Sequence, residues 1–210
     1  LRQGFHYTGK ANWSEKHRRY LRELKLPVPS LKAVLEEYLL MIDQAEKRLS
    51  NIDDLLAVQV RGWRMFPAVE ALMCMRGIQL TAATVLIAEI GDIHRFRHPR
   101  QLMGFLGLVP LEKTTGNTRR IGSITKAGNA HARWMMIEVA QHALLPPKVS
   151  TQLSARQEGQ PQPYRDLAWQ VQTRLHKRGW HLLQRKVMPA KVTVALAREL
   201  TGFIWAMLKM

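Results

Sequence analysis

The chain has 210 residues, of which 46% are hydrophobic and six are Trp, so it can bury a sizeable core in one or two domains and is not a disordered arm. Its 32 Lys and Arg residues against 16 Asp and Glu residues give a formal charge of +16, which indicates a polyanionic partner, usually nucleic acid. The single cysteine, Cys74, excludes disulfides and cysteine-based zinc sites and fits a reducing cytoplasm. The sequence has no apolar run near the roughly 18 residues of a membrane span, so we expect no membrane partner.

Near the N-terminus, Ser14 followed by Glu15 predicts the start of a basic helix that is closed by Pro27 and Pro29. Beyond it, apolar residues recur in alternating steps of four and three, which predicts a coiled-coil helix over about four heptads that ends before Gly62. The repeating residues are Leu31, Leu35, Tyr38, Ile42, Ala45, Leu49, Ile52 and Leu56. We expect this helix to join copies of the chain in a homo-oligomer. An ordinary amphipathic helix packed on its own domain explains the pattern equally well.

Residues 75–91 are typical of a helix-hairpin-helix element. In that element a glycine-containing hairpin presents backbone N–H groups and a helix N-terminus to a phosphate, with Gly77, Gln79 and Thr81 in the contacting positions. Gln79 replaces the usual second glycine, so one position fewer is free to adopt a positive φ. The alternative is a helical hairpin that only packs.

The segment 102–128 holds the pattern that points to chemistry. Thr114 and Thr115 precede Gly116, and a turn-rich basic stretch follows. Hydroxyls among fixed cations suit phosphodiester chemistry, because a positive field lowers the pKa of an attacking hydroxyl and stabilises the charge on phosphoryl oxygens. Spacing alone favours a phosphate-binding loop that cuts nothing. The cations assigned to this segment are Lys113, Arg119, Arg120 and Lys126.

Two long stretches, 113–137 and 167–198, hold no carboxylate and suggest two binding faces. In the first stretch, Asn129 is a suitable N-cap for a helix over 130–140. The dipole of that helix favours an anion at its start, where Arg133 is a further candidate for binding.

Residues 146–163 are rich in Pro, Ser, Gln and Gly and predict a mobile connection. Beyond them, one or two helices interleave cations with Trp169 and Trp180. Cations with aromatics suit a nucleic-acid backbone with exposed bases, although tryptophans more often belong to the core. The cations assigned to binding here are Arg174, Lys177, Arg178, Arg185 and Lys186.

We therefore expect a mainly α-helical fold without convincing strand pairs: a long coiled-coil helix followed by a compact helical domain that contains the helix-hairpin-helix element. The expected domains are 1–62, 63–145 and 146–210. They hold, in turn, the basic helix with the coil, the hairpin with the Thr-Gly loop, and the mobile connection with the basic C-terminal helices.

Several segments, in this order, resemble the insertion-sequence transposases of the DEDD type, relatives of the Piv and MooV invertases that include the bridge-RNA-guided recombinases. The resemblance spans nearly the whole chain and rests on FHYTGKANWSEKHRRYL, GIQLTAATVLIAEIGDIHRFRHPRQLMGFLGLVP, TTGNTRRIGSITKAGNAHARW and AKVTVALARELTGFIWAML. It implies a prokaryotic recombinase associated with the nucleoid in the cytoplasm, with DNA as a partner and, in part of the group, a guide RNA.

The resemblance also implies an N-terminal RuvC-like domain whose acidic tetrad binds a divalent metal such as Mg²⁺, followed by a coil and a domain with a nucleophilic serine that forms a covalent link to DNA. The family's Ser-Gly step falls on Thr115–Gly116 here. Threonine can attack as an alkoxide, but its extra methyl group crowds an in-line approach, so the site is slower or dead. Ser123 is the second candidate nucleophile.

The chain begins without Met and shows no set of metal-binding carboxylates, since Glu89 and Asp92 are expected only to compensate a helix dipole or to be solvated. We expect the RuvC-like domain and its metal to be missing, and no cofactor in this chain. Two functions follow from the resemblance. One is the part of a transposase that supplies the hydroxyl nucleophile; the other is a non-catalytic remnant that clamps DNA or RNA.

Overall fold

The computed structural model describes residues 4–115 and 118–210, with residues 113–115 and 118–120 described through their backbone alone. The described residues are mainly helical, as predicted, and they form two compact units, Leu1–Leu55 and Leu56–Met210. Within the described ranges, no helix combines the length and the apolar character needed to cross a membrane.

In the first unit, helix α1 (Glu15–Glu23) begins where the sequence predicts, because the Ser14 side chain accepts a hydrogen bond from the His17 N–H. The guanidinium of Arg18 binds both Asp43 and Glu46. These carboxylates lie on helix α2 (Pro29–Arg61), so ion pairs hold α1 against the acidic face of α2.

Helix α2 extends through the predicted coiled-coil segment and ends at Arg61, directly before Gly62. Along the predicted seam, Tyr38, Leu49 and Ile52 are exposed by 62%, 60% and 53%. The helix is therefore confirmed, while its pairing with a second copy stays a prediction.

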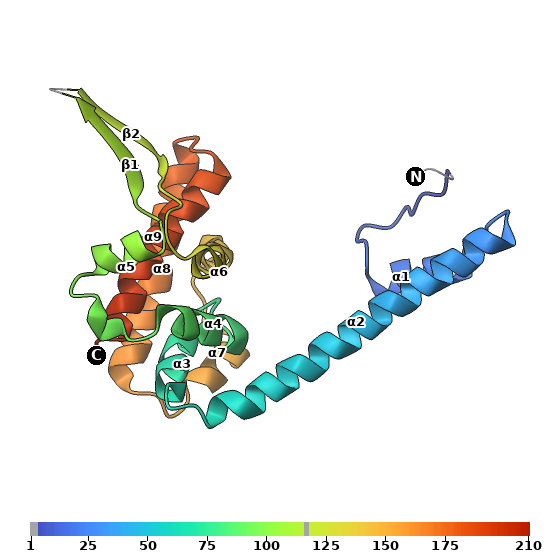
Figure 1. Cartoon of the computed structure of the whole chain (residues 1–210), viewed down its shortest axis with the longest axis horizontal. Helices are drawn as coiled ribbons and strands as arrows, with labels where there is room; N and C mark the ends of the chain where they lie inside the picture. The colour runs from blue at the N-terminus through green and yellow to red at the C-terminus, as the bar shows by residue number, and fades with distance from the viewer. Residues whose placement is uncertain (1–3, 116–117) are drawn as a thin grey trace. The chain divides into compact units, whose positions relative to one another are not determined.

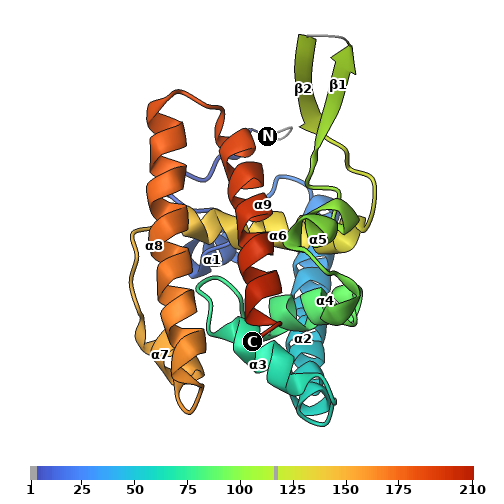
Figure 2. The same cartoon turned by 90° about the vertical axis from the view of Figure 1, so that its left-hand side faces the viewer.

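The second unit is built around helix α9, which contacts α3, α5, α6 and α8. Figure 2 shows α9 between α8 and α5, with α6 running across it. The elements of this unit are α3 (Phe66–Met73), α4 (Leu80–Ile90), η1 (Ile93–Arg95), α5 (Pro99–Phe105), β1 (Pro110–Thr115), β2 (Thr118–Ile124), α6 (Ala130–Gln141), η2 (His142–Leu144), α7 (Thr151–Gln157), α8 (Gln162–Gln184) and α9 (Pro189–Met207).

The core follows from the spacing of small and apolar residues along α9. Its buried residues recur at three- and four-residue intervals, so one face of the helix is apolar along its whole length. They are Val192, Leu196, Ala197, Leu200, Thr201, Ile204 and Met207. Fully burying one Leu or Ile side chain contributes about 1.5–3 kcal/mol.

The expectation of no strand pairs is wrong, because β1 and β2 form an antiparallel hairpin (Figure 1). The pairing extends from Thr115↔Thr118 to Pro110↔Ile124. The β-branched residues of the Thr-Gly segment suit a pleated strand, and the basic side chains between them do not prevent pairing on a two-stranded ribbon.

The stretch 146–163 contains α7, which packs on the second unit through Leu153, exposed by only 2%. Two side chains of α7 bind backbone carbonyls more than 70 residues away: Arg156 donates to Ile78 and Gln157 donates to Cys74. This part of the predicted mobile connection is thus a helix held to the core. The predicted boundaries at residues 62 and 145 stay predictions.

Candidate nucleic-acid interface

The hairpin brings together most of the residues that the sequence assigned to phosphodiester chemistry. Its register pairs Thr115 with Thr118, Thr114 with Arg119, and Lys113 with Arg120 at the Cα positions. The expected nucleophile, Thr115, therefore lies at the last paired position of β1. The pair with Arg119 is one residue away along the strand, and the pair of Lys113 with Arg120 is two residues away. Gly116, the second half of the predicted Thr-Gly step, lies outside the described residues.

Ser123, the second candidate, lies at the other end of the hairpin. Between the pairs Glu112↔Ile121 and Pro110↔Ile124, strand β2 has one residue more than β1, which makes a β-bulge at Gly122–Ser123. Ser123 is exposed there. Ser123 lies five steps along β2 from Thr118, about 16 Å at the usual rise, so Thr115 and Ser123 do not share one site.

Two glycines that the sequence analysis did not single out hold the base of the hairpin on α5. Gly107 (φ +65°) and Gly128 (φ +109°) both adopt a left-handed backbone. A Cβ on Gly107 would meet the Ala127 carbonyl oxygen, and one on Gly128 would meet the Phe105 carbonyl oxygen, both far inside van der Waals contact. The strand–loop–helix path from residue 107 to residue 129 depends on this close approach.

Backbone hydrogen bonds join the same two segments. The N–H groups of Thr125, Lys126 and Asn129 donate to the carbonyls of Val109, Gly107 and Phe105 at 2.9, 3.2 and 2.8 Å. The loop that carries Lys126 is therefore fixed, and Lys126 itself is exposed with a positive φ of 55°.

Helix α6 begins at Asn129 as predicted, with the Asn129 side chain accepting from the Ala132 N–H. The anion at this helix start is the chain's own Glu89, whose carboxylate accepts from Asn129 Nδ2 at 2.6 Å and lies 2.8 Å from His131 Nδ1. Those hydrogen bonds, from Asn129 first and then His131, lower the pKa of Glu89 below its ordinary value. Glu89 thus belongs to a cap, close to its expected dipole-compensating role.

Arg133 is partly buried, and its guanidinium donates to the Leu106 carbonyl at 3.0 Å. This bond supports the turn after α5. The contact of Arg133 with nucleic acid stays a prediction, and one of its N–H donors is already bonded to the Leu106 carbonyl.

The turn between α3 and α4 packs against the rest of the second unit. Gly77 has a φ of +85°, and a Cβ there would lie 2.8 Å from the Cβ of His142. The carbonyls of Cys74 and Ile78 accept hydrogen bonds from α7, as described above. These contacts favour the alternative that the turn at Gly77 only packs. Gln79 and Thr81 are both exposed at the start of α4, and their contact with a phosphate stays a prediction.

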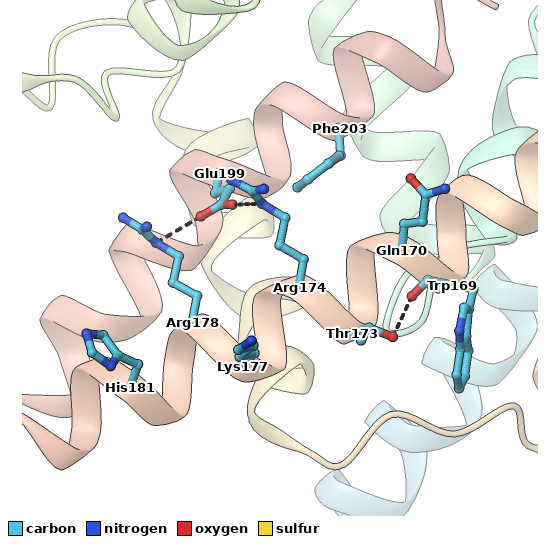
Figure 3. A pocket seen from close by; sticks show the side chains of 9 residues that line it. All are labelled: Trp169, Gln170, Thr173, Arg174, Lys177, Arg178, His181, Glu199 and Phe203. Atoms are coloured by element: carbon cyan, nitrogen blue, oxygen red, sulfur yellow. Dashed lines mark hydrogen bonds and ion pairs between the residues drawn. The ribbon is translucent and has the colours of Figure 1, made fainter.

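The outer face of α8 gathers the C-terminal cations around an open depression of about 760 Å³ (Figure 3). Glu199 of α9 lies between two of them: Arg174 Nε is 2.5 Å and Arg178 Nε is 2.8 Å from its carboxylate oxygens. Lys177 is exposed beside this pair. The lining residues thus carry three cations against one carboxylate, and the depression is positively charged.

Both tryptophans of α8 are half exposed, Trp169 by 47% and Trp180 by 49%, so the core alternative is wrong for them. Sequence reasoning missed Glu199 as the partner of the basic face, since it is 21 residues or more from the arginines that it binds. No local pattern identifies such a pairing.

Arg185 and Lys186 lie in the turn between α8 and α9, where Lys186 has a φ of +58°. In Figures 1 and 2 this turn and the β-hairpin lie at the same end of the second unit, whereas α3 and α7 lie at the other end. The predicted binding residues therefore divide into a larger group near the hairpin and along α8, and a smaller one at the α3–α4 turn.

A divalent metal needs a set of carboxylate or imidazole ligands that converge. Within residues 4–115 and 118–210 there is no group of three or more His, Cys, Asp or Glu side chains placed to hold one. The described residues thus do not fit the metal that the resemblance implies.

Residues 69–153, from α3 to α7, match the transposase family described as IS116/IS110/IS902. The chain is 37% identical over 206 residues, 98% of its length, to a Sinorhizobium fredii protein named as a transposase, y4qE, and covers 50% of it. It is 31% identical to a Pseudomonas aeruginosa protein named as a family 20 transposase, over 55% of this chain and 33% of that one. It is also 30% identical to the transposase for insertion sequence element IS1111A of Coxiella burnetii, over 63% of this chain and 30% of that one.

The chain thus spans half or less of the length of these curated relatives. The matched segment 69–153 contains the whole β-hairpin, its glycine-held base and the cap of α6. The chain therefore carries a segment that matches the transposase domain of the IS116/IS110/IS902 family, and it is similar to one named transposase over 98% of its length.

Proposed function

We propose that this chain is the part of an insertion-sequence transposase that binds DNA and supplies the hydroxyl of Thr115 for strand cleavage and exchange. The observation that carries the proposal is the register of the hairpin, which pairs Thr114 with Arg119 and Lys113 with Arg120 next to Thr115, inside the segment that matches the transposase family.

In the proposed step, the Thr115 oxygen attacks the phosphorus of a phosphodiester. A bond forms between this oxygen and phosphorus, the bond from phosphorus to one sugar oxygen breaks, and the threonine proton leaves to solvent while the departing sugar oxygen gains one. The nearby cations favour this step, because negative charge develops on the phosphoryl oxygens.

The chain's own residues then have three tasks. The hairpin positions the hydroxyl, the basic face of α8 holds the phosphate backbone, and α2 joins copies of the chain. The exposed apolar side chains along α2 support the last task. The acidic tetrad and the Mg²⁺ expected from the resemblance belong to a further domain of the complete protein, and a guide RNA is an expected partner on the same basis.

The second candidate function, a clamp for nucleic acid without chemistry, is supported by the threonine at the position of the family's serine. Both functions require binding that weakens steeply with salt, because each phosphate that a cation neutralises releases counterions. Electrophoretic mobility of this chain with duplex DNA, single-stranded DNA and structured RNA across a salt series measures that requirement; binding that does not change with salt contradicts both.

Covalent chemistry separates the two candidates. In the complete protein, Thr115→Ala should abolish a protein–DNA adduct on denaturing gels while DNA affinity stays nearly unchanged. Thr115→Ser should raise the adduct yield, because it removes the crowding methyl group, and Ser123→Ala is the matched control. An adduct that persists in Thr115→Ala and disappears in Ser123→Ala would move the nucleophile to the hairpin base.

A further inference from the structure

Helix α8 presents two tryptophans to solvent on one side. Trp169 and Trp180 are 47% and 49% exposed. They are eleven residues apart, which is just over three full turns, so the two indoles lie above one another at a separation of about 16 Å along the helix axis. Large aromatic side chains at matched positions on one exposed stripe form a pattern that packing within the chain does not require.

The inner face of α8 explains how the helix is held without them. The buried side chains of α8 are the small or aliphatic Ala168, Val171 and Leu175, together with Gln172, which accepts a hydrogen bond from the Lys148 N–H. Gly179 lets the backbone approach closely, since a Cβ there would lie 2.6 Å from Leu144 Cδ2. The tryptophans are thus not needed to hold α8, and both keep exposed surface for a ligand.

One cation, Lys177, lies beside the stripe of indoles. It is three residues before Trp180 and projects separately in Figure 3, whereas Arg174 and Arg178 turn to Glu199 on the other side of the helix. Asp166, one turn before Trp169, accepts from Gln162 and bounds the stripe with a negative charge. This side of α8 therefore carries two exposed rings with one cation beside the second ring.

Two exposed rings beside a cation match an unpaired nucleic-acid strand. A duplex hides the faces of its bases in the stack and offers only phosphates and base edges to a protein. An unpaired strand offers phosphates and free π-faces together, and bases that stack on aromatic side chains are the common feature of proteins that bind single strands.

We propose that the face of α8 from Trp169 to Trp180 binds an unpaired stretch of DNA strand, with bases stacked on the two indoles and a phosphate on Lys177. This inference rests on the proposed function, since strand exchange requires DNA strands that have left their duplex. It adds a class of substrate and two residues to the binding face.

Fluorescence anisotropy with labelled oligo(dT) of about 12 nucleotides, a length within the usual site sizes, tests the site on this chain. Trp169→Ala and Trp180→Ala should each weaken oligo(dT) binding by about 5-fold to 150-fold, and Trp169→Phe and Trp180→Phe should retain most of it. Binding to a mixed-sequence duplex should change by less than about 3-fold. Trp13→Ala is the matched control, because Trp13 is 53% exposed and lies in the other unit.

Three results would overturn the proposal: unchanged oligo(dT) binding in both alanine variants, an equal loss for oligo(dT) and duplex, or tighter binding of oligo(U) than oligo(dT), which assigns the face to RNA. The phenylalanine variants keep the test valid if an alanine variant unfolds. If duplex binding still depends on salt in any of these cases, the single-strand site is wrong but the proposed function is not contradicted. If the binding of every probe is independent of salt, both the single-strand site and the proposed function are wrong.

Discussion

Replacing Gly128 by Ala should release the base of the β-hairpin. A Cβ at this position would lie 2.1 Å from the Phe105 carbonyl oxygen and 3.0 Å from its carbon. Ordinary C···O contacts are about 3.3 Å or longer, so the loop must move by about 1 Å. The hydrogen bond from the Asn129 N–H to the same carbonyl, now 2.8 Å, does not survive such a shift.

The free energy of unfolding should fall through three separate losses. The positive φ of 109° costs a residue with a Cβ about 1–2 kcal/mol, the lost backbone hydrogen bond about 0.5–1.5 kcal/mol, and a displaced Asn129 cap about 1 kcal/mol. The sum is about 2.5–4.5 kcal/mol if all three occur.

Gly159→Ala measures the cost of the positive φ alone, because Gly159 has a φ of +72° and open space where its Cβ would be. Urea unfolding followed by circular dichroism should show Gly128→Ala less stable than Gly159→Ala by about 2 kcal/mol, with unchanged m-values. Amide exchange at Asn129 should accelerate in Gly128→Ala alone. A difference below about 0.5 kcal/mol, with Asn129 still protected, would refute the close approach as the basis of the hairpin's position.

Two further measurements test the charged groups. Because hydrogen bonds lower the pKa of Glu89 in the folded state, its stabilising effect is complete above the unfolded pKa near 4.3 and is lost as pH falls through the folded pKa. The difference in unfolding free energy between the wild type and Glu89→Gln should therefore shrink between pH 6 and the acid range, about pH 3, and a constant difference would contradict this. For DNA binding, the double variant Arg119→Ala/Arg120→Ala should reduce the slope of log K against log salt by about 2 on duplex DNA, and an unchanged slope would show that neither arginine contacts a phosphate.

The sequence predicted those elements whose signals are local. Ser14 and Asn129 each accept a hydrogen bond from an N–H three residues on, and a cap of this kind is visible in four consecutive residues. The long helix ends at Arg61 because Gly62 follows, and its apolar repeat is equally local. Such signals do not depend on the rest of the fold.

The hairpin was missed because its determinants are spread over the chain. The segment around Thr115 reads as a turn, and its strands become evident only when their partners are known. The register is set by pairing and by the contact of Gly107 and Gly128 with segments about 20 residues away. A glycine in a sequence indicates freedom of φ but not what lies against it.

The exposure of the α8 tryptophans could not be predicted for a related reason. Both tryptophans and the aliphatic residues occur along the same helix, so hydrophobicity does not say which side faces the core. That side is decided by α9 and by Leu144 of η2, which pack against Gly179 and the aliphatic stripe. The resulting outward position of Trp169 and Trp180 is a property of the packing.

The position of Thr115 near the end of a projecting hairpin bears on how a transposase could divide its active site between domains. A two-stranded ribbon is marginally stable alone, so this hairpin depends on its glycine-held base for its position. Under the proposed function, Arg119 and Arg120 would bind the DNA and also stabilise the charge that develops on phosphorus when the strand is cut, so binding and activation would depend on the same residues.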